Sequence, residues 1–376
     1  MPCPTTEVVT TDPPSTFKCR VPGGLESAGV SRSPDLEEPP AIQPPLVSIL
    51  IVNYNTRSLI RDCLESLRSV AYPAFEVLCV DNGSADGSAR MIREDFPKVR
   101  LFESAENLGF VGANLLAYPQ AEGDYVLFLN SDTTVEPDFL DILVDFMEEH
   151  PEAGGCEPKI LWMKDPTRLD SIGDFLTWTG MLYHHGYLAP DDGLTSPEPI
   201  FSAKGACMMF RSSLLESIGV FDERYFAYFE ETDLCWRTWL SGSKIFFVPD
   251  ARVNHLLAGT SQNTDSHLVN FHSFKNRIHS MLKNLGTVET LKILPVHLFL
   301  CVGIATMYAL RGRFRKSSAI LEALFWNIRN LRGTLASRRV VQREIRQVSD
   351  QELMRTAKVP VPLNYFWKLY REYESV

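Results

Sequence analysis

The sequence lacks several features that mark common classes of protein. Its formal net charge is −10, whereas a general nucleic-acid binder carries a basic surface, so we expect no nucleic-acid partner. Its eight cysteines include no Cys-x-x-Cys pair, which indicates a reducing compartment and no disulfide framework. The N-terminus has no basic start followed by an apolar stretch, so we expect no secretory signal.

Short apolar runs alternate with amphipathic segments after residue 45. The runs are rich in β-branched residues, as strands buried on both faces are, and the segments between them have helical periodicity. This alternation predicts an α/β fold in which helices flank a mostly parallel, Rossmann-like sheet. The predicted strands are 46–52, 75–80, 99–102 and 125–129, and the predicted helices are 59–70, 87–95 and 112–120.

Composition divides the chain into three regions. Residues 1–45 are rich in Pro, Ser, Thr and Glu without an apolar period, which predicts a disordered leader. Residues 46–290 hold the alternating pattern and then a less regular stretch with a strand candidate at 244–248. We expect these residues to form one domain and residues 291–376 to form a helical region, apolar first and then basic.

A glycine-rich turn is missing after the first predicted strand. A dinucleotide-binding sheet needs Gly-x-Gly-x-x-Gly there, so that the backbone can approach the pyrophosphate. Here the turn reads Asn53-Tyr54-Asn55-Thr56-Arg57. The sequence therefore excludes a nicotinamide-dependent oxidoreductase built on a similar sheet.

Polar residues gather where the predicted strands end. Ligands of such sheets bind beyond the carboxyl ends of the strands, so these residues are candidates for a binding site. Each group alone is also ordinary turn chemistry, but three groups at one sheet edge favour a ligand. The groups are Asn53 and Asn55, then Asp81, Asn82, Gly83, Ser84 and Asp86, and finally Ser131 and Asp132.

A second cluster of candidates lies further along the chain. Glu230, Glu231 and Asp233 are close together, and crowded carboxylates raise one another's pKa, which suits proton transfer. Acidic residues also favour the first turn of a helix, so a helix cap stays an alternative. His255 is a candidate for binding a metal or a phosphate, and the alternative is a hydrogen-bonded structural histidine.

An ordered set of motifs resembles the inverting glycosyltransferase family 2 with its GT-A fold. The resemblance covers residues 45–284 and is nearest to the rhamnosyltransferase-like enzymes of bacterial polysaccharide and cell-wall assembly. Any one of the motifs is weak, but the full set in order is specific. The motifs are VSILIVNYN, EVLCVDNGSADGS, ENLGFVGANLLA, DYVLFLNSDTTVEPDFL, KGACMMFRSSLLESIGVFDERYFAYFEETDLCWRTWLSG, VNHLLAGTS and FKNRIHSMLKN.

The resemblance implies a role for each matching residue. Asp81 would bind the nucleobase, and Glu231 would be the catalytic base with Asp233 in reserve. Asp132 and His255 would lie at a divalent metal, Mg²⁺ or Mn²⁺, whose preference is for oxygen ligands. The residues expected at the nucleotide and donor sugar are Asn53, Asn55, Asp81, Ser84, Asp86, Asn107, Gly109, Asn114, Ser131, Gly205 and Ala206.

Two positions depart from the family pattern. Asn130 replaces the first aspartate of the metal motif, which removes one negative charge from the expected site. The usual Glu-Asp pair at the catalytic base reads Glu230-Glu231, so the expected base reaches one methylene further. These departures keep open a non-catalytic alternative, a nucleotide-sugar-binding subunit or sensor.

The implied activity is inverting transfer of a sugar from a nucleotide diphosphate to a polysaccharide or lipid-diphosphate-linked saccharide. Rhamnose from dTDP-rhamnose is the favoured donor, and galactose, glucose or N-acetylglucosamine on UDP are the alternatives. Thymine and uracil present the same N3–H, so Asp81 would accept a hydrogen bond from either base.

The C-terminal region has the composition of a membrane-associating segment. Residues 291–310 are mostly apolar and approach the ~20 residues that span a bilayer. Residues 311–346 contain ten basic and two acidic side chains, so the rest of the chain carries −18. We expect a peripheral protein on the cytoplasmic face of the cell membrane. The alternatives are a buried core helix or a soluble helical extension that forms a homodimer.

Overall fold

A computed structural model describes residues 43–256, 265–361 and 365. The predicted leader, residues 1–45, lies outside the described residues except for 43–45. The described residues from Pro44 onward belong to one compact unit.

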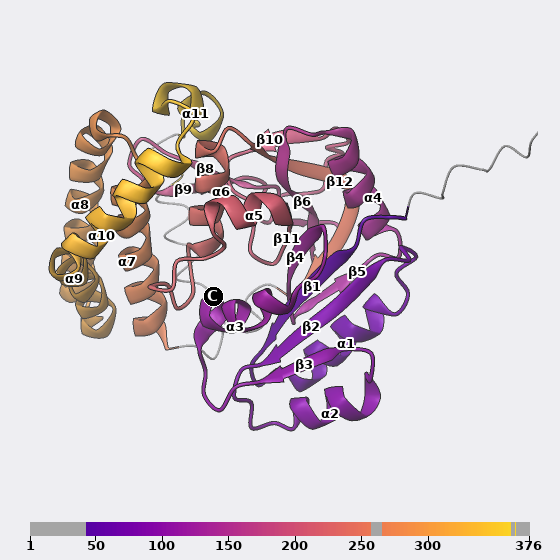
Figure 1. The fold of residues 1–376 in the computed structure, drawn as a ribbon. Helices are drawn as coiled ribbons and strands as arrows, with labels where there is room; N and C mark the ends of the chain where they lie inside the picture. The colour runs from indigo at the N-terminus through magenta and orange to yellow at the C-terminus, as the bar shows by residue number, and fades with distance from the viewer. Residues whose placement is uncertain (1–42, 257–264, 362–364, 366–376) are drawn as a thin grey trace, which may run out of the picture. The chain divides into compact units, whose positions relative to one another are not determined.

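The predicted alternation of strands and helices is confirmed in the first part of the chain. β1 lies between β2 and β4 and is parallel to both, and β3 is parallel to β2 (Figure 1). The carboxyl ends of these strands therefore meet at one edge of the sheet. The elements are β1 (Val47–Asn53), α1 (Arg57–Leu67), β2 (Phe75–Asp81), α2 (Ser88–Asp95), β3 (Arg100–Glu103), α3 (Gly109–Ala117) and β4 (Tyr125–Asn130).

The second part of the sheet is mixed in direction. β11 pairs antiparallel with both β4 and β6, whereas β12 is parallel to β6. The strand order along the sheet is β10-β12-β6-β11-β4-β1-β2-β3, with β5 paired to β12 and β7 to β6, and β8 and β9 form a separate two-stranded sheet. The elements are β5 (Thr133–Val135), α4 (Phe139–Glu149), β6 (Ala153–Trp162), β7 (Leu169–Ser171), β8 (Asp174–Leu176), β9 (Leu182–His184), β10 (Glu198–Ile200), β11 (Cys207–Arg211), α5 (Ser212–Ile218), α6 (Glu230–Leu240) and β12 (Lys244–His255).

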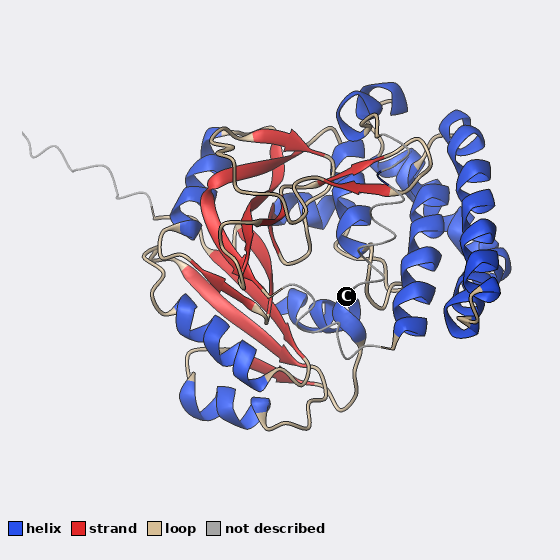
Figure 2. Cartoon of the chain, turned by 180° about the vertical axis from the view of Figure 1, so that it is seen from behind, coloured by secondary structure: helices blue, strands red, loops and turns tan. Residues whose placement is uncertain are grey.

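The central strands bury side chains on both faces, which is why they read as continuous apolar runs. In β1, Ile49 and Ile51 pack in the cluster that contains Ile60 of α1. Leu50 between them belongs to the other cluster, with Val111 of α3. Figure 2 shows helices on both sides of the sheet, as this alternation requires.

The last part of the described chain is helical. α7 (Ser266–Asn284) packs against α6, and α9 packs against both α7 and α8. The other helices are α8 (Thr287–Leu310), α9 (Phe314–Arg329), α10 (Leu331–Val340) and α11 (Asp350–Ala357). α8 is long and apolar enough to cross a membrane by length and composition, and it alone meets that test among the residues described.

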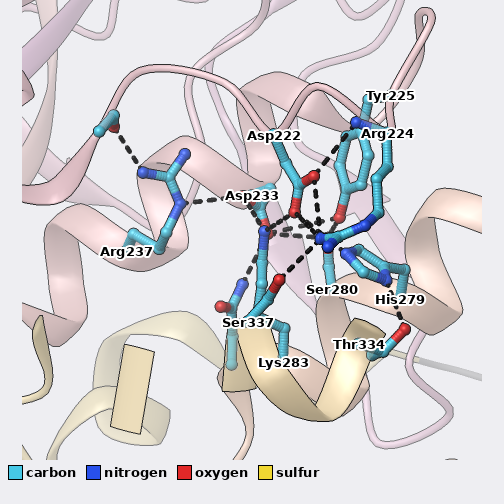
Figure 3. Close-up of polar contacts among 12 residues, drawn as sticks. Asp222, Arg224, Tyr225, Asp233, Arg237, His279, Ser280, Lys283, Thr334 and Ser337 are labelled. Carbon is cyan, nitrogen blue, oxygen red and sulfur yellow. Dashed lines mark hydrogen bonds and ion pairs between the residues drawn. The ribbon is translucent and has the colours of Figure 1, made fainter. Parts of the chain in front are cut away.

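A buried charge cluster connects these helices to the sheet domain (Figure 3). The Lys283 ammonium of α7 lies 2.9 Å from a carboxylate oxygen of Asp222 and 2.9 Å from one of Asp233 in α6. Arg237 donates to Asp233 at 3.0 Å, and a ring nitrogen of His279 lies 3.1 Å from Asp222. Lys283 and Asp233 are both buried, so each charge depends on the others for compensation.

We expect Lys283→Met to lower the free energy of unfolding by about 3–5 kcal/mol, because it leaves Asp222 and Asp233 without their shared cation. Denaturant unfolding of the purified protein measures this difference. The control is Lys292→Met, whose partner is the local Glu289 and whose side chain is 62% exposed. That control should change stability by no more than about 0.5 kcal/mol. Equal changes in the free energy of unfolding would contradict the assignment of Lys283 as the shared cation of Asp222 and Asp233.

Candidate active site

The ends of β1 and β2 are joined by a buried polar network. The side-chain amide of Asn53 donates to Asp81 at 2.8 Å and to the Ser88 hydroxyl at 2.9 Å. The backbone N–H of Ser84 donates to the other oxygen of Asp81 at 3.1 Å. Asp81 is 3% exposed, so the loop after β2 is fixed around its carboxylate. The structure thus brings together three of the strand-end residues, Asn53, Asp81 and Ser84, with Ser88 of α2.

A second set of contacts ties the same loop to the start of α1. Asn55 accepts from the Ala85 N–H at 2.8 Å, and its own N–H donates to Ser84 at 3.0 Å. Asp86 accepts from the backbone N–H of Arg57 at 2.8 Å and from that of Ser88 at 3.0 Å. Burial opposes ionisation of Asp86, but these hydrogen bonds outweigh it and lower its pKa. Asp86 therefore shapes the loop, as a turn residue does.

The residues near α3 that are expected at the donor sugar also bond to the backbone or to one another. The Asn82 amide donates to the Asn107 side-chain oxygen at 3.0 Å and to the Gly109 carbonyl at 3.1 Å. Gly109 has φ +73°, and a Cβ there would collide with the carbonyl oxygen of Phe226. Asn114 donates to the carbonyl one turn earlier in its own helix. These contacts hold the start of α3 beside the loop before α6, which contains Phe226.

Asp132 and His255 meet at the end of the sheet. His255 is the last residue of β12, and its register partner in β5 is Thr133, next to Asp132. Nε2 of His255 lies 3.3 Å from Oδ1 of Asp132, and Nδ1 lies 2.5 Å from Oδ2 of Asp170. Burial alone would lower the pKa of His255, but the hydrogen bonds with Asp132 and Asp170 raise it to about 9.

The Asp132 carboxylate is a fitting ligand for a divalent cation. It is 1% exposed, and the donor nearest to it among the described residues is Nε2 of His255, 3.3 Å from Oδ1. A buried carboxylate with so few donors is unfavourable unless positive charge offsets it. The described residues hold no cluster of three or more His, Cys, Asp and Glu side chains around a metal position. Asp132 and His255 would therefore share the ion with oxygens from a bound ligand.

Glu231 lies across a short loop from this end of the sheet. The backbone N–H of Asn130 donates to the Ala206 carbonyl at 2.9 Å. A Cβ on Gly205 would sit 3.7 Å from Cβ of Glu231, at van der Waals distance, so the two residues are direct neighbours. The Gly205–Ala206 pair thus connects the strand that carries the metal candidates to the first turn of α6.

Burial and neighbouring charges raise the pKa of Glu231 to about 7. Burial is the largest cause, and the carboxylate of Asp174 adds to it. Burial and Glu231 together raise the pKa of Glu230, one of whose oxygens is buried without a partner. A carboxylate with a pKa near neutrality is suited to accept a proton at physiological pH.

The structure argues against Asp233 as the reserve base. Burial raises its pKa, but Lys283 and Arg237 outweigh that effect and lower it to about 2. Both of its oxygens are bonded, to Lys283, Arg237, Asn284 and other groups of the charge cluster in Figure 3. Asp233 stabilises the α6–α7 contact, so its role in the first turn of α6 is structural.

Asp170 and Lys204 are site residues that the sequence did not reveal. Asp170 is fully buried, holds His255 through Nδ1, and pairs with the Lys204 ammonium at 2.8 Å. Asp170 lies in the three-residue strand β7, which is too short for a periodic pattern. Lys204 precedes Gly205, and that adjacency is the one signal that could have pointed to it.

Asp174 and His184 form a second pair that sequence reasoning missed. They face each other across the β8–β9 hairpin, with Nδ1 of His184 2.7 Å from Asp174. The charges of both residues act on the pKa of Glu231. Glu157 is a further buried acid beside Lys204, because it accepts a hydrogen bond from the Lys204 backbone N–H at 2.6 Å. Burial raises the pKa of Glu157 well above its usual value.

Residues 48–219 match the sequence model of Glycosyl transferase family 2. This span includes β1 to β11, the strand-end network and Asp132. The chain is a glycosyltransferase. The fold of the transferase is the GT-A fold, in which helices flank a mixed sheet, followed here by a C-terminal helical region.

Two relatives and one solved structure describe what the transferase is similar to. It is 29% identical to an N-acetylglucosaminyl-diphospho-decaprenol L-rhamnosyltransferase of Mycobacterium tuberculosis, over 60% of this chain and 81% of the relative. It is 28% identical to the O-antigen biosynthesis protein RfbC of Myxococcus xanthus, over 56% of this chain and 17% of that protein. The crystal structure of S. aureus TarS 1-349 with UDP-GlcNAc covers 79% of this chain and 90% of its own, with a TM-score of 0.51 and 18% identity.

We expect Asp170→Asn to reduce the activity of the transferase by about 10–100-fold, because the amide no longer holds His255 as a carboxylate does. The concentration of Mn²⁺ needed for half-maximal activity should rise at the same time. Asp165→Asn is the control, since Asp165 is an exposed neighbour that bonds only within its own turn. An unchanged metal dependence in Asp170→Asn would show that Asp170 does not position His255.

Proposed function

We propose that this transferase moves a sugar from a nucleotide diphosphate to an acceptor hydroxyl with inversion at the anomeric carbon. The observation that carries the proposal is the pairing of two unlike carboxylates on either side of the Gly205–Ala206 loop. Asp132 is buried and has His255 as its nearest donor, whereas Glu231 has a pKa raised to about 7. Such a division suits one carboxylate for a cation and the other for a proton.

On the donor side, Asp81 and the loop after β2 would receive the nucleobase. Asp132 and His255 would hold Mg²⁺ or Mn²⁺ beside the diphosphate. A divalent cation bound there neutralises the charge that develops on the leaving diphosphate. Lys204 and Asp170 keep His255 in the orientation that directs Nε2 toward Asp132.

On the acceptor side, Glu231 would take the proton of the attacking hydroxyl. The hydroxyl oxygen forms the bond to the anomeric carbon while the bond from that carbon to the diphosphate oxygen breaks on the opposite face. This in-line displacement inverts the configuration. Glu231 must be ionised to act, so activity should rise with pH through its pKa.

The favoured donor is dTDP-rhamnose, and the favoured acceptor is a saccharide linked to a lipid diphosphate. Support comes from the M. tuberculosis relative, whose name describes a rhamnosyltransferase that acts on a lipid-diphosphate-linked sugar. UDP-linked sugars are the alternative donors, because Asp81 accepts from the N3–H of thymine or uracil alike. We place the reaction at the cytoplasmic face of the cell membrane, where such an acceptor would be reached.

Release of nucleoside diphosphate from one of a panel of dTDP- and UDP-sugars is the expected result with full-length protein, lipid extract and Mn²⁺ or Mg²⁺. EDTA and Asp132→Ala should each abolish release, because both remove the charge balance at the diphosphate. Asp138→Ala, at an exposed acid in the same segment, should be as active as wild type. Nucleotide binding without release from any donor would favour a nucleotide-sugar-binding subunit instead.

Glu231→Gln should reduce kcat by about 10²–10⁴-fold while nucleotide binding is kept, since the amide cannot accept a proton. The wild-type rate should rise with pH and level off above about pH 7, where Glu231 is ionised. The matched control is Glu223→Gln, at an exposed glutamate in the loop before α6. A Glu231→Gln protein with the wild-type rate and pH profile would remove Glu231 from the base role.

A further inference from the structure

α8 exposes a stripe of large apolar side chains. Val288, Leu291, Phe299, Val302 and Leu310 are 63%, 71%, 78%, 49% and 85% exposed. Their spacing is close to whole turns of a helix, so they share one side. Large apolar side chains exposed this far and this regularly mark an interaction surface rather than an ordinary soluble one.

The opposite side of α8 is committed to the protein. Ile293, His297, Cys301 and Ala305 recur every four residues, and all are at most 2% exposed. Nδ1 of His297 lies 3.0 Å from the backbone carbonyl oxygen of Thr179, in the stretch before β9. α8 also packs along α9. Insertion across a bilayer would carry these polar and protein contacts into lipid, so the helix is held flat against the domain.

α9 also exposes large apolar side chains. Phe314, Leu321, Phe325 and Ile328 are between 50% and 72% exposed, and α9 follows α8 after a short turn. α8 and α9 lie side by side at the left edge of Figure 1, on the far side of the molecule from α1 and α2. We call these exposed residues of α8 and α9 the apolar face.

Basic side chains lie near the apolar face. Lys292 on α8 pairs with Glu289, Arg315 pairs with Asp265, Lys316 follows the turn, and Arg329 ends α9. Residues 311–346 carry ten basic and two acidic side chains, whereas the rest of the chain sums to −18. Anionic lipid head groups attract such a cluster. A second copy of the chain would present the same positive charge to it across a two-fold axis, which disfavours a dimer.

We propose that the apolar face lies in the plane of an anionic bilayer, with α8 embedded along its length and not spanning. Basic side chains of the α8–α9 turn and of α9 would contact the head groups. This inference concerns lipid binding alone and holds whichever sugar is transferred. It would place the domain that carries Glu231 and Asp132 at a fixed height above the membrane surface.

Flotation of the full-length protein with vesicles tests the binding. The protein should float with phosphatidylcholine–phosphatidylglycerol vesicles, much less with phosphatidylcholine alone, and less at high salt. Phe299→Asp should lower the vesicle partition coefficient about tenfold or more, because the substitution removes a large apolar side chain that the lipid would bury. Leu116→Asp, at a similar exposed leucine on α3, should float as wild type. Wild-type nucleotide binding by both variants shows that they are folded.

Depth measurements separate an in-plane helix from a spanning one. Spin labels are placed singly by Val288→Cys, Phe299→Cys and Leu310→Cys in a Cys3→Ser, Cys19→Ser background. α8 is about 36 Å long at ~1.5 Å per residue, so its ends differ greatly in depth if it spans. Similar shallow depths for all three labels are expected. A deep central label between two surface labels would overturn the in-plane arrangement.

A second result would also overturn the membrane proposal. If wild type stays with the soluble fraction for every vesicle, and is a dimer that Phe299→Asp converts to a monomer, the apolar face is a contact between two copies. Failure of this proposal leaves the transferase reaction untouched, since nucleoside diphosphate release is measured separately.

Discussion

The rest of the candidate site depends on the contact between the buried carboxylate of Asp132 and the ring of His255. Asp132 follows the central strand β4, and the only positive group the described residues bring to it is His255. Asp170 and Lys204 then fix His255 from behind. An arrangement of this kind is costly for an empty protein and favourable once a cation and an anionic ligand share it. The sheet brings these residues together, because β12 pairs with β5 and β6, and β6 pairs with β7.

Two acidic residues two positions apart on α6 show how environment separates their roles. Burial raises the pKa of Glu231 to about 7, whereas Lys283 and Arg237 overcome burial and lower that of Asp233 to about 2. The first carboxylate is next to Gly205 and the sheet edge, and the second points into the contact with α7. The first turn of α6 therefore serves proton transfer on one side and the attachment of the C-terminal helices on the other.

The sequence predicted the first part of the fold well, because parallel strands buried on both faces read as unmistakable apolar runs. It also predicted which residues follow the strand ends, and the contacts of Asn53 with Asp81 and Ser84 join them as expected. It could not predict β7 to β10, since strands of three residues carry no period. Asp170 was missed for that reason. The role of Asp233 depends on Lys283, fifty residues away, which no local pattern reveals.

The most direct test of whether Asp132 and His255 share a cation is a measurement of Mn²⁺ binding. Binding is detected as a loss of the electron paramagnetic resonance signal of free Mn²⁺. We expect weak binding of Mn²⁺ alone and much tighter binding when dTDP or UDP is added. Asp132→Ala should lose this gain in Mn²⁺ affinity. Nucleoside diphosphate that binds equally well without metal, or a gain that persists in Asp132→Ala, would contradict the assignment of Asp132 and His255 to a shared cation.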